Sequence, residues 1–194
     1  MPQKELLIVA GPNGAGKSTF VGRFLSERPC PYLSADLIAT ELTIKEPVAL
    51  QFAAGQEFLA RLQAQLLADR DFIVETTLSG LTWRKYLRQA RELGFEITIY
   101  FIYLDSADTC VARVTERVRC GGHGVPEQDN RRRFSRSLAN IWNTYRKIAD
   151  HWAIAYNPGG SPVEVAFGYQ EDFAVTDETL FRRFLELAEV ESDG

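Results

Sequence analysis

The sequence has few cysteines, no long apolar run and no excess of positive charge. Its three cysteines, Cys30, Cys110 and Cys120, are scattered over 194 residues, with neither zinc spacing nor the pattern of a disulfide framework. The longest apolar run, Ile97–Leu104, is far shorter than the ~20 residues that a membrane span needs. The polar residues 1–5 are not typical of a signal peptide. These absences argue against a disulfide scaffold and a membrane protein, and they favour a reducing, cytoplasmic location.

Positive charge is concentrated in one segment of an acidic chain. The chain carries 22 lysines and arginines against 26 acidic residues, a net charge of −4. Between Arg113 and Arg136, seven arginines stand against three acidic residues, a local balance of +4. Such a patch on an acidic protein is typical of a site for a discrete anionic ligand rather than a long polyanion. Nucleic acid is therefore not an expected partner.

Short β-rich runs alternate with helical stretches. The length fits one domain over residues 1–194, because domains typically run to roughly 100–200 residues. Strands are predicted at Leu6–Ala10, Pro31–Leu33, Asp71–Thr76, Glu96–Leu104 and Ala153–Tyr156, with Val163–Gly168 added at an edge. Helices are predicted at Lys17–Ser26, Pro47–Asp69, Thr82–Leu93, Asp108–Arg119 and Glu127–Trp152, and the acidic end Glu189–Gly194 is expected to fray. This order predicts right-handed βαβ crossovers and an α/β fold, a three-layer α/β/α arrangement with a mostly parallel central sheet.

A phosphate-binding loop stands between the first predicted strand and the first helix. Its residues, Gly11-Pro12-Asn13-Gly14-Ala15-Gly16-Lys17-Ser18, fit G-x-x-x-x-G-K-[ST] at every fixed position. Glycines let backbone N–H groups turn inward around a phosphate. The helix that follows, which includes Thr19, points its positive end at the same place. Lys17 is expected to reach the β- and γ-phosphates and Ser18 to ligate Mg²⁺, so the loop predicts ATP and Mg²⁺ as cofactors.

Three other classes of P-loop protein lack their marks in this sequence. No asparagine is followed by lysine, so the base-reading Asn-Lys-x-Asp motif of switch GTPases is absent. Leu78-Ser79-Gly80 begins like an ABC signature but continues Leu81-Thr82. One domain leaves no second domain for an AAA-type ring. Small nucleotide and metabolite kinases remain.

Asp36 follows the second predicted strand, at the sheet edge where ligands of open α/β folds bind. A carboxylate there can accept the proton of an attacking hydroxyl, a contribution of about 10²–10⁴ in rate, and can orient the substrate. The alternative is that Asp36 only caps a helix over Leu37–Leu42.

Glu75 and Thr77 end the third predicted strand beside the loop. Glu75 can hold Mg²⁺ or, with Thr77, bind substrate hydroxyls, and the sequence does not choose between the two roles. The alternative is a solvated strand end whose hydroxyls cap the next helix.

The arginine-rich segment, about residues 113–136, has the pattern of a two-armed lid. Arg113 and Arg117 share one helix face, and Arg132 and Arg136 share a face of the next helix. The glycine-rich break Gly121–Pro126 lets the two arms close over a triphosphate and neutralise γ-phosphate charge. We expect four of the seven arginines to touch phosphate: Arg117, Arg119, Arg132 and Arg136. The alternative is a solvated basic face.

Two further positions stay open between a structural and a functional role. His123, within the break, is expected to be a hydrogen-bonding loop residue rather than a catalyst. Asn157, after the last parallel strand, is expected either to contact adenine or to form a plain turn with Pro158-Gly159-Gly160.

Together these motifs resemble the zeta-toxin family of P-loop kinases, in its shorter bacterial branch. The resemblance runs from Lys4 to about Asn157. Besides the phosphate loop, it rests on Ala35-Asp36-Leu37-Ile38-Ala39, Glu75-Thr76-Thr77-Leu78-Ser79-Gly80, Gly121-Gly122-His123-x-Val125-Pro126, and Arg-Arg-x-x-Arg-Ser at Arg132–Ser137. It implies a P-loop kinase fold, with Lys17 on phosphate, Asp36 as base and lid arginines on the γ-phosphate. Known members phosphorylate UDP-N-acetylglucosamine and are held inactive by a small helical antitoxin, so that acceptor and that kind of partner are what the resemblance implies.

The sequence thus predicts an ATP-dependent phosphotransferase with a small hydroxyl-bearing acceptor. The alternative is a P-loop ATPase or nucleotide-binding regulator that engages nucleic acid or a protein partner. A third reading is kinase chemistry on a macromolecule such as an RNA end.

Overall fold

The computed structural model describes residues 4–122 and 124–189; the expectations for His123 and for residues 190–194 lie outside this range. A seven-stranded sheet runs in the order β2-β3-β1-β4-β5-β6-β7. Its strands are β1 (Lys4–Ala10), β2 (Tyr32–Ser34), β3 (Phe72–Thr76), β4 (Phe95–Tyr103), β5 (His151–Tyr156), β6 (Val163–Tyr169) and β7 (Asp172–Val175). The first five strands in this order pair in parallel and the last two in antiparallel fashion. The mostly parallel α/β fold is therefore confirmed.

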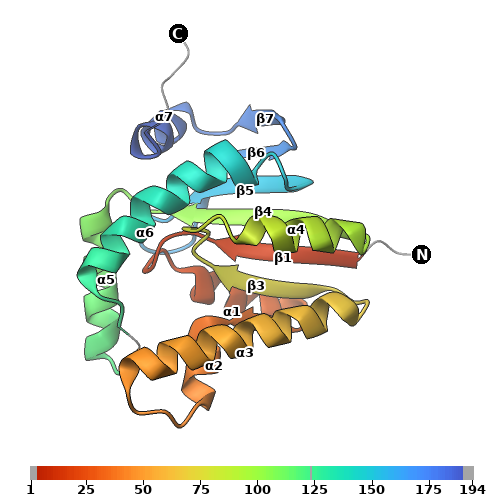
Figure 1. Ribbon diagram of the computed structural model, residues 1–194. Helices are drawn as coiled ribbons and strands as arrows, with labels where there is room; N and C mark the ends of the chain where they lie inside the picture. The colour runs from red at the N-terminus through yellow and green to blue at the C-terminus, as the bar shows by residue number, and fades with distance from the viewer. Residues whose placement is uncertain (1–3, 123, 190–194) are drawn as a thin grey trace.

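Helices cover both faces of the sheet, and most of them lie on one face (Figure 1). They are α1 (Lys17–Glu27), α2 (Ala35–Glu41), α3 (Pro47–Leu67), α4 (Trp83–Glu92), α5 (Ala107–Arg119), α6 (Glu127–Asn140) and α7 (Glu178–Leu187). Successive residues of a strand point to opposite faces. In β4, Tyr100 stacks on Phe20 of α1 while Phe101 packs against Phe184 of α7. Helices α1 and α7 thus lie on opposite faces of the sheet.

The predicted strands lie near the observed ones. The apolar runs from which they were predicted are buried in the structure. From Leu6 to Ala10, β1 is at most 8% exposed, as expected for a strand that pairs with β3 on one side and β4 on the other. Gly94 ends the stretch after α4 with φ of +81°, the left-handed conformation that a glycine cap provides. β6 was predicted as an edge addition, but β7 lies outside it.

The helix predicted over Glu127–Trp152 is wrong in its last third. Helix α6 ends at Asn140, a π-helical turn covers Ile141–Tyr145, and β5 begins at His151. The turn closes through a hydrogen bond from the amide of Arg146 to the carbonyl of Ile141, 3.0 Å. The residues after it are strand rather than helix because they pair in register with β4, Trp152 opposite Ile99.

Two side chains of this region tie the loop after β3 in place. Asn140 donates from Nδ2 to the carbonyl of Leu78 at 2.9 Å, and the hydroxyl of Tyr145 donates to the carbonyl of Gly80. Leu78 is fully buried with φ of +50°, a conformation that costs free energy in a branched residue and persists only where the surroundings hold it. The loop between β3 and α4 is therefore fixed by α6 and the turn that follows it.

The three cysteines are expected to differ sharply in reactivity. Burial raises the pKa of the Cys110 thiol to about 12 and also raises the pKa of Cys30, whereas Cys120 is exposed. Because the thiolate is the reactive form, iodoacetamide at pH 8 should label Cys120 first and Cys110 last, as measured by mass spectrometry of peptides. In urea all three should react at similar rates, and equal labelling of Cys110 and Cys120 in the folded protein would contradict the burial described here.

Candidate active site

The phosphate loop spans residues 11–18, between the carboxyl end of β1 and the first turn of α1. Gly14 and Gly16 take φ of +80° and +94°, which other residues rarely adopt. A Cβ at Gly16 would come within 2.5 Å of Nδ2 of Asn157, and one at Gly14 within 2.9 Å of the carbonyl oxygen of Cys110. Both conformation and space therefore require glycine at these two positions.

Lys17 is buried at the start of α1, with its side chain 7% exposed. Its ammonium donates to the carbonyl of Pro12 at 2.9 Å and lies 3.9 Å from Oε1 of Glu75. Burial lowers the pKa of Lys17, and the charges of Glu75 and Asp36 partly oppose this effect. The ammonium thus lies inside the curve of the phosphate loop, with a carboxylate rather than bulk water beside it.

Glu75, the fourth residue of β3, faces the loop. Its side chain is 9% exposed; Oε2 accepts a hydrogen bond from Oγ of Ser18 at 2.9 Å and another from the hydroxyl of Tyr32. Burial and Glu75 together raise the pKa of Tyr32, so this phenol stays protonated and donates. The alternative of a solvated strand end is wrong for Glu75.

The pair formed by Ser18 and Glu75 fits a magnesium ion. Mg²⁺ takes six oxygen ligands at about 2.0–2.1 Å, so neighbouring ligands lie about 2.9 Å apart, which is the separation of Ser18 Oγ and Glu75 Oε2. Within residues 4–122 and 124–189, no cluster of three or more histidine, cysteine or acidic side chains could hold a metal. In kinases Mg²⁺ usually binds one or two protein groups and completes its shell with water and substrate phosphates, so the pair of Ser18 and Glu75 is a sufficient set of protein ligands.

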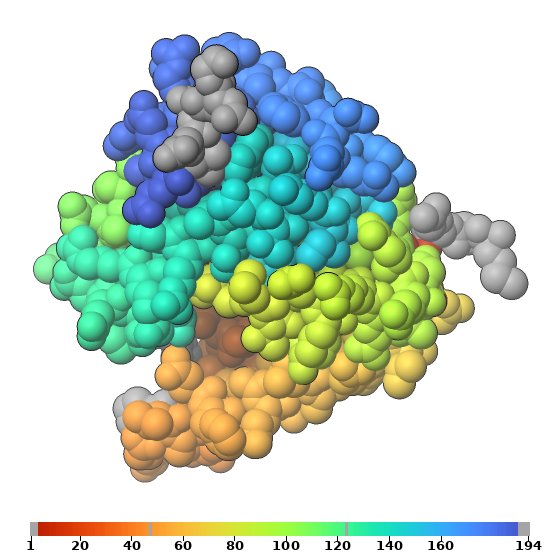
Figure 2. All heavy atoms as spheres, turned by 45° about the horizontal axis from the view of Figure 1, so that its top comes forward, coloured from red at the N-terminus to blue at the C-terminus, as the bar shows by residue number. Residues whose placement is uncertain are grey.

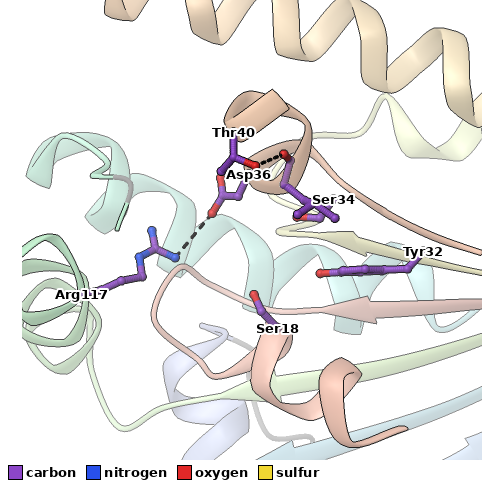
Figure 3. A pocket seen from close by; sticks show the side chains of 7 residues that line it. Ser18, Tyr32, Ser34, Asp36, Thr40 and Arg117 are labelled. Atoms are coloured by element: carbon purple, nitrogen blue, oxygen red, sulfur yellow. Dashed lines mark hydrogen bonds and ion pairs between the residues drawn. The ribbon is translucent and has the colours of Figure 1, made fainter. Parts of the chain in front are cut away.

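Asp36 lies in the first turn of α2 and lines three adjoining pockets. The P-loop pocket, about 230 Å³, also contains Gly14, Gly16, Lys17, Ser18, Thr19, Glu75 and Arg113. The β3 pocket, about 260 Å³, adds Phe58, Thr76, Thr77, Ser79 and Arg133. The α2 pocket, also about 260 Å³, is shown in Figure 3 and contains Ser18, Tyr32, Ser34, Leu37, Thr40 and Arg117. The carboxylate of Asp36 thus lies where the P-loop pocket adjoins the β3 pocket and the α2 pocket.

Asp36 does not cap a helix. The N-cap of α2 is Ser34, two residues earlier, so the cap alternative is wrong. Instead, Oδ2 of Asp36 lies 3.4 Å from Nη1 of Arg117, which reaches across from α5 (Figure 3). The Asp36 side chain is 54% exposed, so a second molecule can approach it.

Three arginines reach these pockets: Arg113 and Arg117 from α5 line the P-loop pocket, and Arg133 from α6 lines the β3 pocket. Figure 2 shows the corresponding hollow between the N-terminal half of α3 and the paired helices α5 and α6. Helices α5 and α6 thus both bring arginines to the pockets, while their closure as a lid stays a prediction. Of the four favoured arginines, the structure places Arg117 at a pocket.

The other favoured arginines lie elsewhere. Arg119 is 74% exposed and pairs with Glu116 at 3.4 Å, and Arg132 is 53% exposed and pairs with Asp129 at 2.7 Å. Arg136 is also exposed, and none of the three lines the P-loop, β3 or α2 pockets as the described residues form them. The structure therefore does not bring Arg119, Arg132 and Arg136 to these pockets, and their contact with phosphate stays a prediction.

The rotation of helix α6 about its axis explains why Arg132 and Arg136 lie away from the pockets. The buried side of α6 is formed by Asn130, Phe134, Ser137 and Leu138. At 3.6 residues per turn, Arg132 and Arg136 point away from this side, whereas Arg133 lies at its margin. The spacing of Phe134, Leu138 and Ile141 in the sequence is a signal that could have shown Arg132 and Arg136 to face away from the core, although it does not single out Arg133.

Thr77 lines the β3 pocket, where a substrate-binding residue could lie. Ser79, which was not predicted as a site residue, lines the same pocket. Their hydroxyls lie 2.9 Å apart. The alternative that hydroxyls here cap the next helix is wrong, because α4 begins after Thr82 with no side-chain cap. The β3 pocket therefore presents the hydroxyls of Thr77 and Ser79 and the carboxylates of Asp36 and Glu75 together with Arg133.

Comparison with known proteins shows the family of the chain. A family model described as "AAA domain" matches residues 6–141, which include the phosphate loop, Asp36, Glu75 and both arginine arms. The chain belongs to this AAA-domain family. Membership of this family concerns the domain and does not by itself imply a ring. A relative from Haemophilus influenzae, described as an uncharacterized protein, is 27% identical over 125 residues, 64% of this chain and 89% of the relative.

Solved structures share the fold at low sequence identity. The crystal structure of AvrRxo1-ORF1:ORF2 with ATP matches at a TM-score of 0.66 and 15% identity, over 99% of this chain and 66% of that one. This chain therefore spans about two thirds of the length of AvrRxo1-ORF1. The PezAT toxin–antitoxin system of Streptococcus pneumoniae matches at 0.59 and 15% identity, over 97% and 85% of the chains. A gluconokinase from Sinorhizobium meliloti matches at 0.52 and 14% identity, over 97% and 94%. The AAA-domain chain thus has a P-loop kinase-like fold. Among its described residues, no helix is both long and apolar enough to span a bilayer.

Proposed function

We propose that this protein is a phosphotransferase that moves the γ-phosphoryl group of ATP, bound with Mg²⁺, to a hydroxyl group of a small molecule in the cytoplasm. The observation that carries the proposal is the place of Asp36, which lines the P-loop pocket and both adjoining pockets. A carboxylate shared by a phosphate site and a second space is what transfer to a hydroxyl requires. The P-loop kinase-like fold supports the same reaction.

The proposed chemistry assigns a role to each group. A hydroxyl oxygen of the acceptor attacks the γ-phosphorus and gives its proton to Asp36, while the bond from the γ-phosphorus to the bridging oxygen breaks and its electron pair leaves with ADP. Lys17 holds the β- and γ-phosphates, and Mg²⁺ supplies further charge neutralisation where Ser18 and Glu75 would hold it. Arg117 and Arg133, which line pockets around Asp36, stabilise the charge of the transferring group, the main requirement of this reaction.

The acceptor is proposed to bind in the β3 pocket, where Thr77, Ser79 and Glu75 offer hydrogen bonds to hydroxyl groups. UDP-N-acetylglucosamine is the first acceptor to test, because the motifs resemble those of zeta toxins. The test is incubation of the protein with ATP, Mg²⁺ and UDP-N-acetylglucosamine, or with a panel of sugars and sugar acids, followed by mass spectrometry of the products. A phosphorylated acceptor would support the proposal. Hydrolysis of ATP with no acceptor modified would favour the alternative of an ATPase or regulator.

Replacing Glu75 with glutamine should distinguish its two roles. If Glu75 helps to hold the metal, Glu75→Gln should raise the Mg²⁺ concentration needed for half-maximal activity by roughly tenfold, because an anionic oxygen is replaced by a neutral one. If it binds the acceptor instead, the KM of the acceptor should rise and the Mg²⁺ dependence should stay unchanged. Titrations of Mg²⁺ at fixed ATP measure this, with Thr77→Val as the comparison for a residue of the β3 pocket alone. An unchanged Mg²⁺ titration would exclude the metal role.

A protein partner is part of the proposal. Two of the structural neighbours, AvrRxo1-ORF1 with ORF2 and the PezAT system, are described with a second component, and a small antitoxin would fit this pattern. The test is co-expression with the product of any short helical reading frame beside the gene, followed by size-exclusion chromatography and an activity assay. A stable complex with suppressed ATP turnover would support the partner, and independent elution of the two proteins with unchanged turnover would count against it.

A further inference from the structure

We propose that Asn157 is a positioning residue that aims the phosphate loop from behind, with Arg113 holding Asn157 in turn. The inference rests on the proposed binding of ATP at this loop. It gives Asn157 a role that differs from both sequence-based readings, an adenine contact and a plain turn.

The side chain of Asn157 connects the end of β5 to the phosphate loop, and both its amide nitrogen and its amide oxygen are hydrogen-bonded. Asn157 is 5% exposed. Its Nδ2 donates to the carbonyl of Ala15 at 2.8 Å, and its Oδ1 accepts from the amide of Gly159 at 3.1 Å. Its amide donates to the carbonyl of Tyr103 at 3.0 Å, which continues the pairing of β5 with β4. The residue is therefore held at its backbone and at both ends of its amide group.

The bond to Ala15 determines where the next amide points. The carbonyl of Ala15 and the N–H of Gly16 belong to one planar trans peptide, so they point in opposite directions. Asn157, which holds that carbonyl, is not among the described residues that line the P-loop pocket, whereas Gly16 is. The N–H of Gly16 is thereby directed toward the space where a phosphate would bind. Because Gly16 accepts many backbone conformations, an external hold on this peptide is needed to keep one of them.

Arg113 completes the arrangement from α5. Its Nη2 donates to the carbonyl of Asn157 at 3.2 Å, and it also lines the P-loop pocket. A Cβ at Gly14 would come within 3.3 Å of Cβ of Arg113, so this side chain packs directly against the loop. The first arm of the arginine segment is thus fastened to the rear of the phosphate loop through Asn157.

The experiment is a binding titration without any acceptor, by calorimetry. The probes are MgADP and magnesium tripolyphosphate, the second of which has phosphates but no base. Asn157→Ala and the nearly isosteric Asn157→Leu should each weaken both probes by about tenfold, the usual scale of one lost hydrogen bond. Arg113→Met should weaken both probes as well, and because Arg113 also lines the P-loop pocket, this loss alone does not distinguish positioning of Asn157 from direct contact with phosphate. Tyr103→Phe is the matched control: it also removes one donor from a backbone carbonyl, that of Leu180 at 2.8 Å, and should leave both affinities within twofold.

Each outcome decides the proposal. Equal loss for both probes in folded Asn157 variants supports positioning of the loop. Loss for MgADP alone would instead make Asn157 an adenine contact and overturn the proposal, as would unchanged binding of both probes. If neither Asn157 variant folds, Asn157→Asp decides in the same way, because it keeps the acceptor for the amide of Gly159 and loses the donor to the carbonyl of Ala15. Wild-type protein that binds neither probe would overturn both this inference and the proposed function, whereas wild-type binding of MgADP with no transfer to any acceptor would overturn only the function.

Discussion

Asp36→Asn is expected to lower the rate of phosphoryl transfer by about 10²–10⁴-fold, the usual contribution of a general base and equivalent to about 3–5 kcal/mol of barrier. The amide keeps the shape of the carboxylate but cannot accept the proton of the attacking hydroxyl. Affinity for MgATP should change by only a few fold, because the phosphates are held by the loop and Lys17 rather than by Asp36. Initial rates of product formation, together with a titration of MgADP, measure the two quantities separately.

The ion pair between Asp36 and Arg117 calls for a control. The neutral amide of Asp36→Asn would release the arginine partner, so a loss of rate could come from a displaced Arg117 rather than from a missing base; the two atoms lie 3.4 Å apart. Asp36→Glu keeps the charge and should retain more activity than Asp36→Asn. Transfer by Asp36→Asn at the wild-type rate would contradict the role of base.

Arg133→Ala is expected to reduce kcat by about 10³-fold or more, at the lower end of what an arginine on a transferring phosphoryl group supplies. The side chain lines the β3 pocket with Lys17, Asp36 and Glu75, and its guanidinium can neutralise charge that develops on the γ-phosphate. Rates at saturating ATP measure this effect. A companion measurement of thermal stability separates it from loss of folding.

Arg132→Ala provides the matched comparison, one position away on the same helix. Arg132 is 53% exposed and pairs with Asp129, so its removal should change kcat by less than threefold, since exposed ion pairs contribute little. The two variants together show whether Arg132, which the sequence favoured, or Arg133, which lines the β3 pocket, contributes to the reaction. A larger loss in Arg132→Ala than in Arg133→Ala would favour Arg132 as the residue that contacts phosphate.

The parts of the site that the sequence predicted are those fixed by local spacing or by the direction of strands. The phosphate loop needs eight consecutive residues and no knowledge of the fold. Asp36 and Glu75 follow because residues after parallel strands gather at one edge of the sheet; β2 and β3 indeed pair with Ser34 opposite Glu75. Such rules carry no information on how far a side chain reaches, so the contact of Glu75 with Ser18 could not be predicted.

What the sequence could not provide depends on helix phase or on distant contacts. Spacing four apart shows that Arg132 and Arg136 share a face, but only the packing of Phe134 and Leu138 decides which face points inward. The hydrogen bond from Asn157 to Ala15 joins residues 142 positions apart, so no local sequence pattern could predict it. Strand β7 was missed because its four residues, three exposed and one half-buried, lack the alternation of a half-buried strand.

Helix α7 was not predicted, although the sequence contains a helix-capping residue and an apolar periodic run at this position. Asp177 caps it by accepting a hydrogen bond from the amide of Leu180, and Phe181 and Phe184 lie on its buried side. Aspartate before an apolar periodic run is a recognised helix start. The helix packs on the same side as α6, where Trp142 contacts Phe181 and Phe184.

The central claim, transfer of the γ-phosphoryl group to an organic hydroxyl at Asp36, can be tested without knowing the acceptor. ATP labelled with ¹⁸O in the γ-phosphoryl group would be incubated with Mg²⁺, a bacterial small-metabolite extract and either wild-type protein or Asp36→Asn, and the label followed by mass spectrometry. The account predicts a labelled phosphate monoester with wild-type protein and almost none with the variant. Label found only in inorganic phosphate, or the same ester formed equally by both proteins, would contradict it.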